Sequence, residues 1–122
     1  MGIYSFKARI IKTYSKNIIL GICSFDIRYT VNNYHSPYFL GLSLSEKTVL
    51  GNNKSDVAIQ AVELVEGRSV VKVEVDMNKS VISWFLDDGF LCARRIPTEI
   101  TSKDVYPVIS LYNTGDSLEL IV

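Results

Sequence analysis

Residues 69–95, SVVKVEVDMNKSVISWFLDDGFLCARR, decide the fold. From Val71 to Asp76 apolar and charged residues alternate, which places them on opposite faces of a β-strand. Asp88-Gly89 predicts a tight hairpin, because glycine tolerates the positive φ that such turns need. The stretch therefore predicts three antiparallel strands, at residues 71–76, 81–86 and 90–95, joined by short turns. Since neighbours on a strand face opposite sides, Trp84 and Phe85 cannot both enter one core layer.

The rest of the chain consists of short apolar runs separated by turn residues. Ile18–Ser24 is apolar almost throughout, as expected of a strand buried on both faces. Ala58–Val65 fits a short helix or an irregular strand, and we expect it to be non-helical because a lone two-turn helix is marginal. Residues 51–54 are expected to form a turn, and residues 26–37 the longest loop. Further strands are expected at residues 6–13, 38–44, 48–50, 105–112 and 117–122.

Roughly nine to ten short strands predict an all-β fold, an antiparallel β-sandwich. The 122 residues correspond to a single domain, 1–122. Thirteen basic and thirteen acidic residues give a formal net charge of zero, which argues against a nucleic-acid partner. No apolar run is long enough for a membrane helix.

The two cysteines, Cys23 and Cys92, lie in apolar runs, and no secretory signal precedes them. We therefore expect buried reduced thiols and an intracellular, cytoplasmic protein. Arg94-Arg95 is expected to place one charge in solvent and one at a sheet edge. Because the chain has a single histidine and no calcium-loop motif, we expect neither a metal site nor a cofactor.

The segment from Glu66 onward resembles the SPRY domain family. In that family a glycine-containing turn leads into a valine-rich strand, an aromatic strand, a hairpin and a strand that begins with Tyr-Pro. The matching residues here are Glu66-Gly67, Val71–Asp76, Ile82–Leu86, Asp88-Gly89, Val105–Leu111 and Asp116–Leu120. Tyr4–Ile10, Leu20–Ile22 and residues 38–53 are similar more loosely.

The resemblance implies a concanavalin-like jelly roll and a non-enzymatic module that binds a protein or peptide through loops at one end of the sandwich. Members of the family usually carry one or two more strands upstream of Tyr4. Their absence here implies an open sheet edge near the N-terminus, through which the chain could self-associate or join an assembly.

The loop from Phe25 to His35 holds tyrosines, an arginine and amides, the residue types favoured at binding hot spots. A self-packed loop whose tyrosines cover the sheet remains the alternative. The resemblance adds the turn after the Tyr-Pro strand. The residues expected to bind a partner are Ser24, Arg28, Tyr29, Tyr34, His35, Tyr112, Asn113 and Thr114.

Other function classes have weaker support. A lectin-like sandwich could use Tyr34 as a sugar platform beside Asn32 and Asn33, and a structural subunit of an assembly would use the open edge. For an enzyme, the neighbours His35 and Ser36 lack a nucleophile-elbow motif. Asp87-Asp88 is explained by turn chemistry. We therefore expect no catalytic residues.

Overall fold

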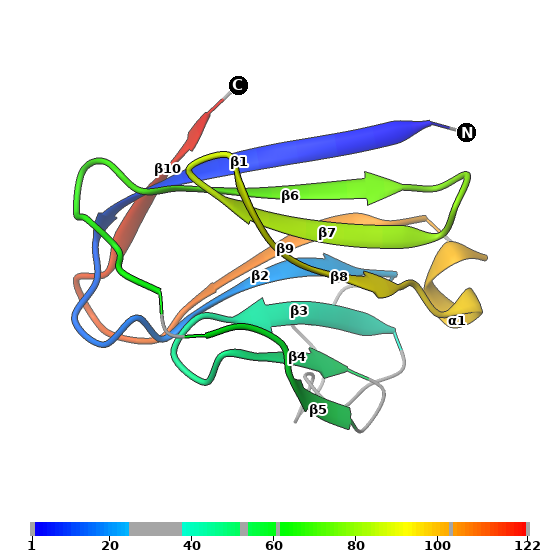
Figure 1. The fold of residues 1–122 in the computed structure, drawn as a ribbon, viewed down its shortest axis with the longest axis horizontal. Helices are drawn as coiled ribbons and strands as arrows, with labels where there is room; N and C mark the ends of the chain where they lie inside the picture. Colours follow the sequence, from blue (N-terminus) through cyan, green and yellow to red (C-terminus); the bar gives the residue numbers. More distant parts are fainter. Residues whose placement is uncertain (1, 25–37, 52–53, 61, 103, 122) are drawn as a thin grey trace.

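The computed structural model describes residues 2–24, 38–51, 54–60, 62–102 and 104–121. It forms two stacked, five-stranded sheets, and every strand pair is antiparallel (Figure 1). The upper sheet has the order β10-β1-β6-β7-β8, and the lower sheet β5-β4-β3-β2-β9. This confirms the predicted all-β sandwich.

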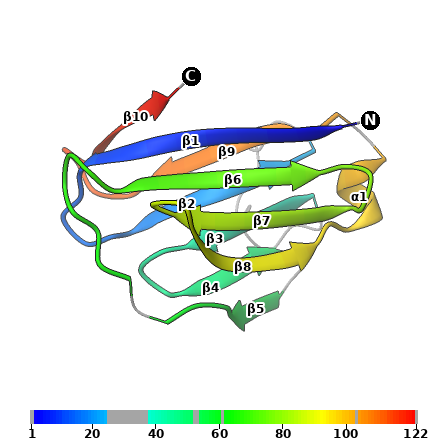
Figure 2. The ribbon, with the colours of Figure 1, turned by 45° about the horizontal axis from the view of Figure 1, so that its top comes forward.

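The upper sheet contains β1 (Ile3–Lys12), β6 (Val70–Asp76), β7 (Val81–Leu86), β8 (Gly89–Arg95) and β10 (Ser117–Ile121). The lower sheet contains β2 (Ile18–Cys23), β3 (Phe39–Ser43), β4 (Thr48–Gly51), β5 (Lys54–Val57) and β9 (Tyr106–Leu111). One short helix, α1 (Thr98–Thr101), joins the sheets at the end where β1 begins (Figures 1 and 2). No helix in the described residues is long and apolar enough to cross a membrane.

The core lies between the sheets and follows the predicted alternation. Val71, Val73 and Val75 are buried while the residues between them are half-buried. Every residue of β2 is buried, as its apolar run predicts. Cys23 and Cys92 are both buried, as predicted, and no disulfide joins them.

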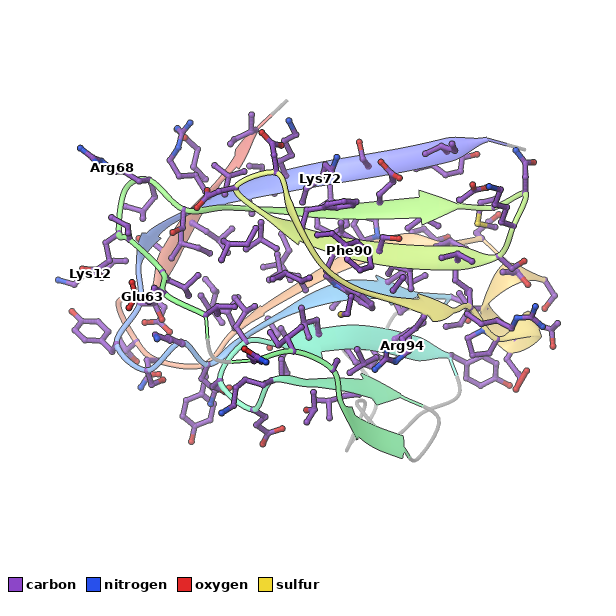
Figure 3. The ribbon with its side chains drawn as sticks, in the orientation of Figure 1. Lys12, Glu63, Arg68, Lys72, Phe90 and Arg94 are labelled. Atoms are coloured by element: carbon purple, nitrogen blue, oxygen red, sulfur yellow. The ribbon has the colours of Figure 1, made fainter. Side chains whose placement is uncertain are left out.

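Trp84 and Phe85 face opposite sides of the upper sheet, as predicted. Trp84 is fully buried and its Nε1 donates a hydrogen bond of 2.9 Å to the Leu20 carbonyl. Phe85 lies on the outer face. Its ring packs edge-on against the Phe90 ring, with 5.8 Å between the ring centres, and the Lys72 ammonium lies 4.3 Å from the centre of the Phe85 ring. Figure 3 shows Lys72 and Phe90 over this sheet.

Of two other sequence expectations, one is confirmed and one is wrong. The described residues of the segment 58–65 are neither helix nor strand, which agrees with the non-helical choice. Lys54–Val57, by contrast, pairs with β4 as a strand where the sequence predicted a turn that included Lys54. Its composition carries no apolar alternation, so the strand exists through backbone pairing with β4.

The hairpin between β7 and β8 differs from the prediction in one detail. The residues with positive φ are Asp87 (49°) and Asp88 (68°), while Gly89 already belongs to β8. Two central residues with positive φ define a type I′ turn. Asp87 also joins the turn to the start of β6, because its Oδ1 accepts a hydrogen bond of 2.9 Å from the Val70 amide.

Asp88→Gly is therefore expected to raise the free energy of unfolding by about 0.5–1 kcal/mol. Glycine at the second turn position adopts a positive φ without the backbone strain that aspartate has there. Asp87→Gly is the matched control and should gain nothing, since it also loses the bond to Val70. Chemical denaturation of both variants measures the difference. Equal stabilisation by the two changes would contradict this account.

In the described residues, the first half of β1 pairs on one side only. From Lys7 to Arg9, β1 pairs with both β10 and β6. β10 ends at Ile121 opposite Lys7, so Ile3–Phe6 is paired with β6 alone in the described chain (Figure 2). At the opposite side of this sheet, β8 is the edge and carries half-buried Arg94 and exposed Arg95, as expected for that pair.

Candidate partner-binding site

The predicted binding residues that the structure describes follow directly after two strands, β2 and β9, that run in opposite directions. In the β2–β9 pair, Ile18 lies opposite Leu111 and Cys23 opposite Tyr106. The residue after β2 and the turn after β9 are therefore at opposite ends of the sandwich (Figure 1). The structure does not bring Ser24 together with Tyr112, Asn113 and Thr114.

Ser24 is buried, with 5% of its surface exposed. Its amide donates a hydrogen bond of 2.9 Å to the Tyr38 carbonyl, which ties together the two ends of the intervening segment. Ser24 is therefore a buried residue that holds the backbone in place. Arg28, Tyr29, Tyr34 and His35 lie outside the described residues.

The turn after β9 is exposed and held by its own hydrogen bonds. Tyr112 is 75% exposed, and Thr114 is exposed too. Asp116 accepts hydrogen bonds from the Tyr14 amide (2.9 Å) and the Asn113 amide (3.1 Å) through its two carboxylate oxygens. The Asn113 side chain accepts another from the Ser15 hydroxyl. The turn is thereby fixed to the connection between β1 and β2.

Tyr14 is a candidate that sequence reasoning missed. It is 60% exposed, lies beside the same turn and packs against Gly115, where an added Cβ would come within 3.0 Å of its ring. The Lys12 ammonium lies 5.0 Å from the ring centre. The pKa of Lys12 is raised above its ordinary value, chiefly by a hydrogen bond with Tyr14. The sequence showed Tyr14 only as the start of a turn, because its neighbours at residues 113–116 are remote in the chain.

We call Tyr14, Tyr112, Asn113 and Thr114 the tyrosine turn surface. Two exposed phenol rings beside an amide and a hydroxyl offer apolar area together with directed hydrogen bonds, the chemistry of protein-binding surfaces. Figure 3 shows Lys12 and Arg68 projecting from this end of the sandwich, near Glu63. The Lys12 ammonium beside Tyr14 therefore places a positive charge next to the surface.

Ionisable groups elsewhere show structural roles. Burial raises the pKa of the Cys92 thiol, which keeps it protonated and a poor nucleophile at neutral pH. Asp87 accepts its hydrogen bond from the Val70 amide at the start of β6. Among the described residues no group of three His, Cys, Asp or Glu side chains could hold a metal ion.

Two of the solved structures similar to this one are SPRY domains. The SPRY domain of human HERC1 superposes with a TM-score of 0.74 at 15% identity, over 98% of this chain and 74% of that one. The TRIM65 PSpry domain gives 0.70 at 18% identity, over 99% of this chain and 65% of that one. Stonustoxin gives 0.69 at 19% identity, and only 20% of its chain is covered.

No family model and no curated protein matches the sequence. The likeness is therefore one of fold. It confirms the SPRY-like sandwich that the sequence motifs predicted, over nearly the whole chain.

Proposed function

We propose that this domain is a protein-interaction module that binds a peptide segment or partner protein through the tyrosine turn surface. The SPRY-type fold supports a binding role, since rigid sandwiches present loops as recognition surfaces. The predicted residues Arg28, Tyr29, Tyr34 and His35 would form a separate contact, because the segment that carries them is anchored at the far end by Ser24 and Tyr38. We further propose that the module acts inside the cell, where its two buried cysteines, Cys23 and Cys92, would stay reduced.

The observation that carries this proposal is an exposed aromatic side chain on an ordered turn. Tyr112 extends into solvent, while the carboxylate of Asp116 holds the residues on both sides of the turn in place. A preorganised surface loses little conformational entropy when it binds, so more of the contact energy appears as affinity.

The test is a peptide-display selection on the purified chain, followed by affinity measurements on substituted chains. Tyr112→Ala and Tyr14→Ala should each weaken a selected peptide about tenfold or more, as hot-spot tyrosines do. Phe90→Ala is the matched control, because Phe90 is equally exposed, at 63%, but lies over the outer face of the upper sheet. It should leave affinity unchanged.

Unchanged affinity in both tyrosine variants would reject this surface. A glycan array run in parallel addresses the lectin alternative. Sugar binding that Tyr112→Ala abolishes, with no peptide selected, would replace the proposed function by carbohydrate binding.

A further inference from the structure

The hydrogen-bond acceptors of the turn after β9 are already used within the chain. The two carboxylate oxygens of Asp116 accept the backbone amides of Tyr14 and Asn113. The Asn113 backbone carbonyl accepts the Asp116 amide at 3.0 Å, and the Asn113 side-chain oxygen accepts the Ser15 hydroxyl. These bonds fold the turn and hold it against the connection between β1 and β2. A partner that offers mainly hydrogen-bond donors would therefore find little to bind here.

The donors of the tyrosine turn surface are in the opposite situation. An asparagine side chain carries two N–H donors, and a tyrosine or threonine hydroxyl carries one. In the part of the chain that the structure describes, the Asn113 side-chain nitrogen and the Tyr112 and Thr114 hydroxyls make no hydrogen bond. Tyr112 and Thr114 are also exposed. The surface therefore presents donors to a partner, which favours a partner rich in acceptors.

Lys12 adds a positive charge beside these donors. Its side chain is exposed, and its ammonium lies 5.0 Å from the centre of the Tyr14 ring. The raised pKa of Lys12 keeps this group protonated at neutral pH. An ammonium has three donors, and neither ion pair between described residues includes Lys12. Lys12 projects from the end of the sandwich that carries the turn (Figure 3), so it can meet an acceptor from outside the chain.

The acidic residues at this end do not pair with Lys12. Glu66 contributes to the raised pKa of Lys12, but its Oε2 accepts the Thr13 amide at 2.9 Å. Asp116 accepts two backbone amides, whose dipoles offset part of its charge. Glu63, which Figure 3 shows at the same end, makes no ion pair with another described residue. Formal charges are thus mixed here, and the available hydrogen-bonding groups, more than net charge, select the partner.

The two aromatic rings restrict the partner further. Tyr14 is 60% and Tyr112 75% exposed, and such rings are best covered by apolar side chains. A small inorganic anion would accept hydrogen bonds but would leave both rings in water. An acidic peptide segment supplies side-chain carboxylates, backbone carbonyls and apolar neighbours together. It therefore matches the donors, the charge and the rings at once.

We propose that the tyrosine turn surface selects an acidic peptide segment of a partner protein, in which an aspartate or glutamate carboxylate pairs with Lys12. Further acceptors of the segment bind the Asn113 side-chain N–H groups, and its apolar side chains cover Tyr14 and Tyr112. This inference rests on the proposed function and names the ligand class of that site. A hydrogen bond between two charged groups is about twice as strong as a neutral one, so the segment should bind better than its amide copy.

The probe is a random library of short displayed peptides, selected on the purified chain. Peptides enriched on the unchanged chain should contain aspartate or glutamate. Replacing these residues by asparagine or glutamine in a synthetic copy should weaken binding about tenfold. Lys12→Glu should weaken the acidic peptide by a similar factor and should itself enrich peptides that contain lysine or arginine.

Lys79→Glu is the matched control for Lys12→Glu. Lys79 is also exposed and the substitution changes the net charge equally, but the residue lies in the turn between β6 and β7, at the opposite end of the sandwich. It should leave the affinity unchanged. Because both lysines are exposed, both variants are expected to fold normally, which circular dichroism checks.

Asn113→Asp tests the donors separately from Lys12. An aspartate keeps the oxygen that accepts from Ser15 but has no N–H to offer, so it should weaken the acidic peptide more than its amide copy. Peptides that need Tyr112 but contain no acidic residue, or acidic peptides that Lys12→Glu leaves unaffected, would overturn this inference and leave the proposed function standing. Selection of no peptide that depends on Tyr112 would reject both.

Discussion

Gly21→Ala is expected to cause a large loss of stability, about 4–5 kcal/mol or more. A Cβ at Gly21 would overlap the Leu40 carbonyl oxygen and lie 2.5 Å from the Gly41 Cα. Both atoms are backbone of β3, the strand that pairs directly with β2. Because β9 and β4 hold this pair on either side, neither strand can move away.

Typical domains are stable by only 5–15 kcal/mol, so the variant should be largely unfolded or strongly shifted in denaturation. Circular dichroism during guanidinium denaturation measures the change. Gly2→Ala is the matched control, because a Cβ there meets no atom within 4 Å. A Gly21→Ala chain as stable as the Gly2→Ala chain would show that β2 and β3 are further apart than described.

Trp84→Ala is expected to cost about 3–5 kcal/mol, the usual cost of removing a large buried aromatic ring. Trp84 is fully buried between the sheets, and its indole N–H reaches the Leu20 carbonyl across the core. The substitution leaves a cavity and removes that donor. It therefore weakens the contact between the two sheets themselves.

Phe85→Ala is the control for Trp84→Ala, since it removes the adjacent aromatic ring from the same strand but from the outer face. We expect it to cost only about 1 kcal/mol, mostly through the lost contact with Phe90. Denaturation followed by circular dichroism compares the two. A larger loss for Phe85 than for Trp84 would mean that the faces of β7 are assigned the wrong way round.

The strands of the upper sheet were predictable because each residue's face follows from its position in the chain. Alternation assigned Val71, Val73 and Val75 to the core, and the same rule separated Trp84 from Phe85. β5 was missed because Lys54–Val57 has no such pattern and forms through pairing with β4. The hairpin was located correctly, but its strained positions fell on Asp87 and Asp88 instead of Gly89.

The candidate site was predictable only in part. The turn at Tyr112–Thr114 was found by its resemblance to SPRY domains, and it is exposed. Tyr14 was not found, because its contact with that turn joins residues 102 positions apart, as the bond from Tyr14 to Asp116 shows. The sequence analysis also expected both binding loops at one end of the sandwich. Hydrophobic patterns predict strands and their buried faces, but they do not show at which end of the sandwich a loop lies.

The amino-acid sequence by itself determined the strands, their buried faces and most of their turns, because side-chain direction alternates along any extended backbone. Only the tertiary structure decided which loops share an end of the sandwich and which residues far apart in the chain meet there. Pairing of β2 with β9 in opposite directions separates Ser24 from Tyr112, and the bond from the Tyr14 amide to Asp116 brings Tyr14 to the turn after β9. These arrangements depend on contacts between distant strands, whose free energy no local pattern records.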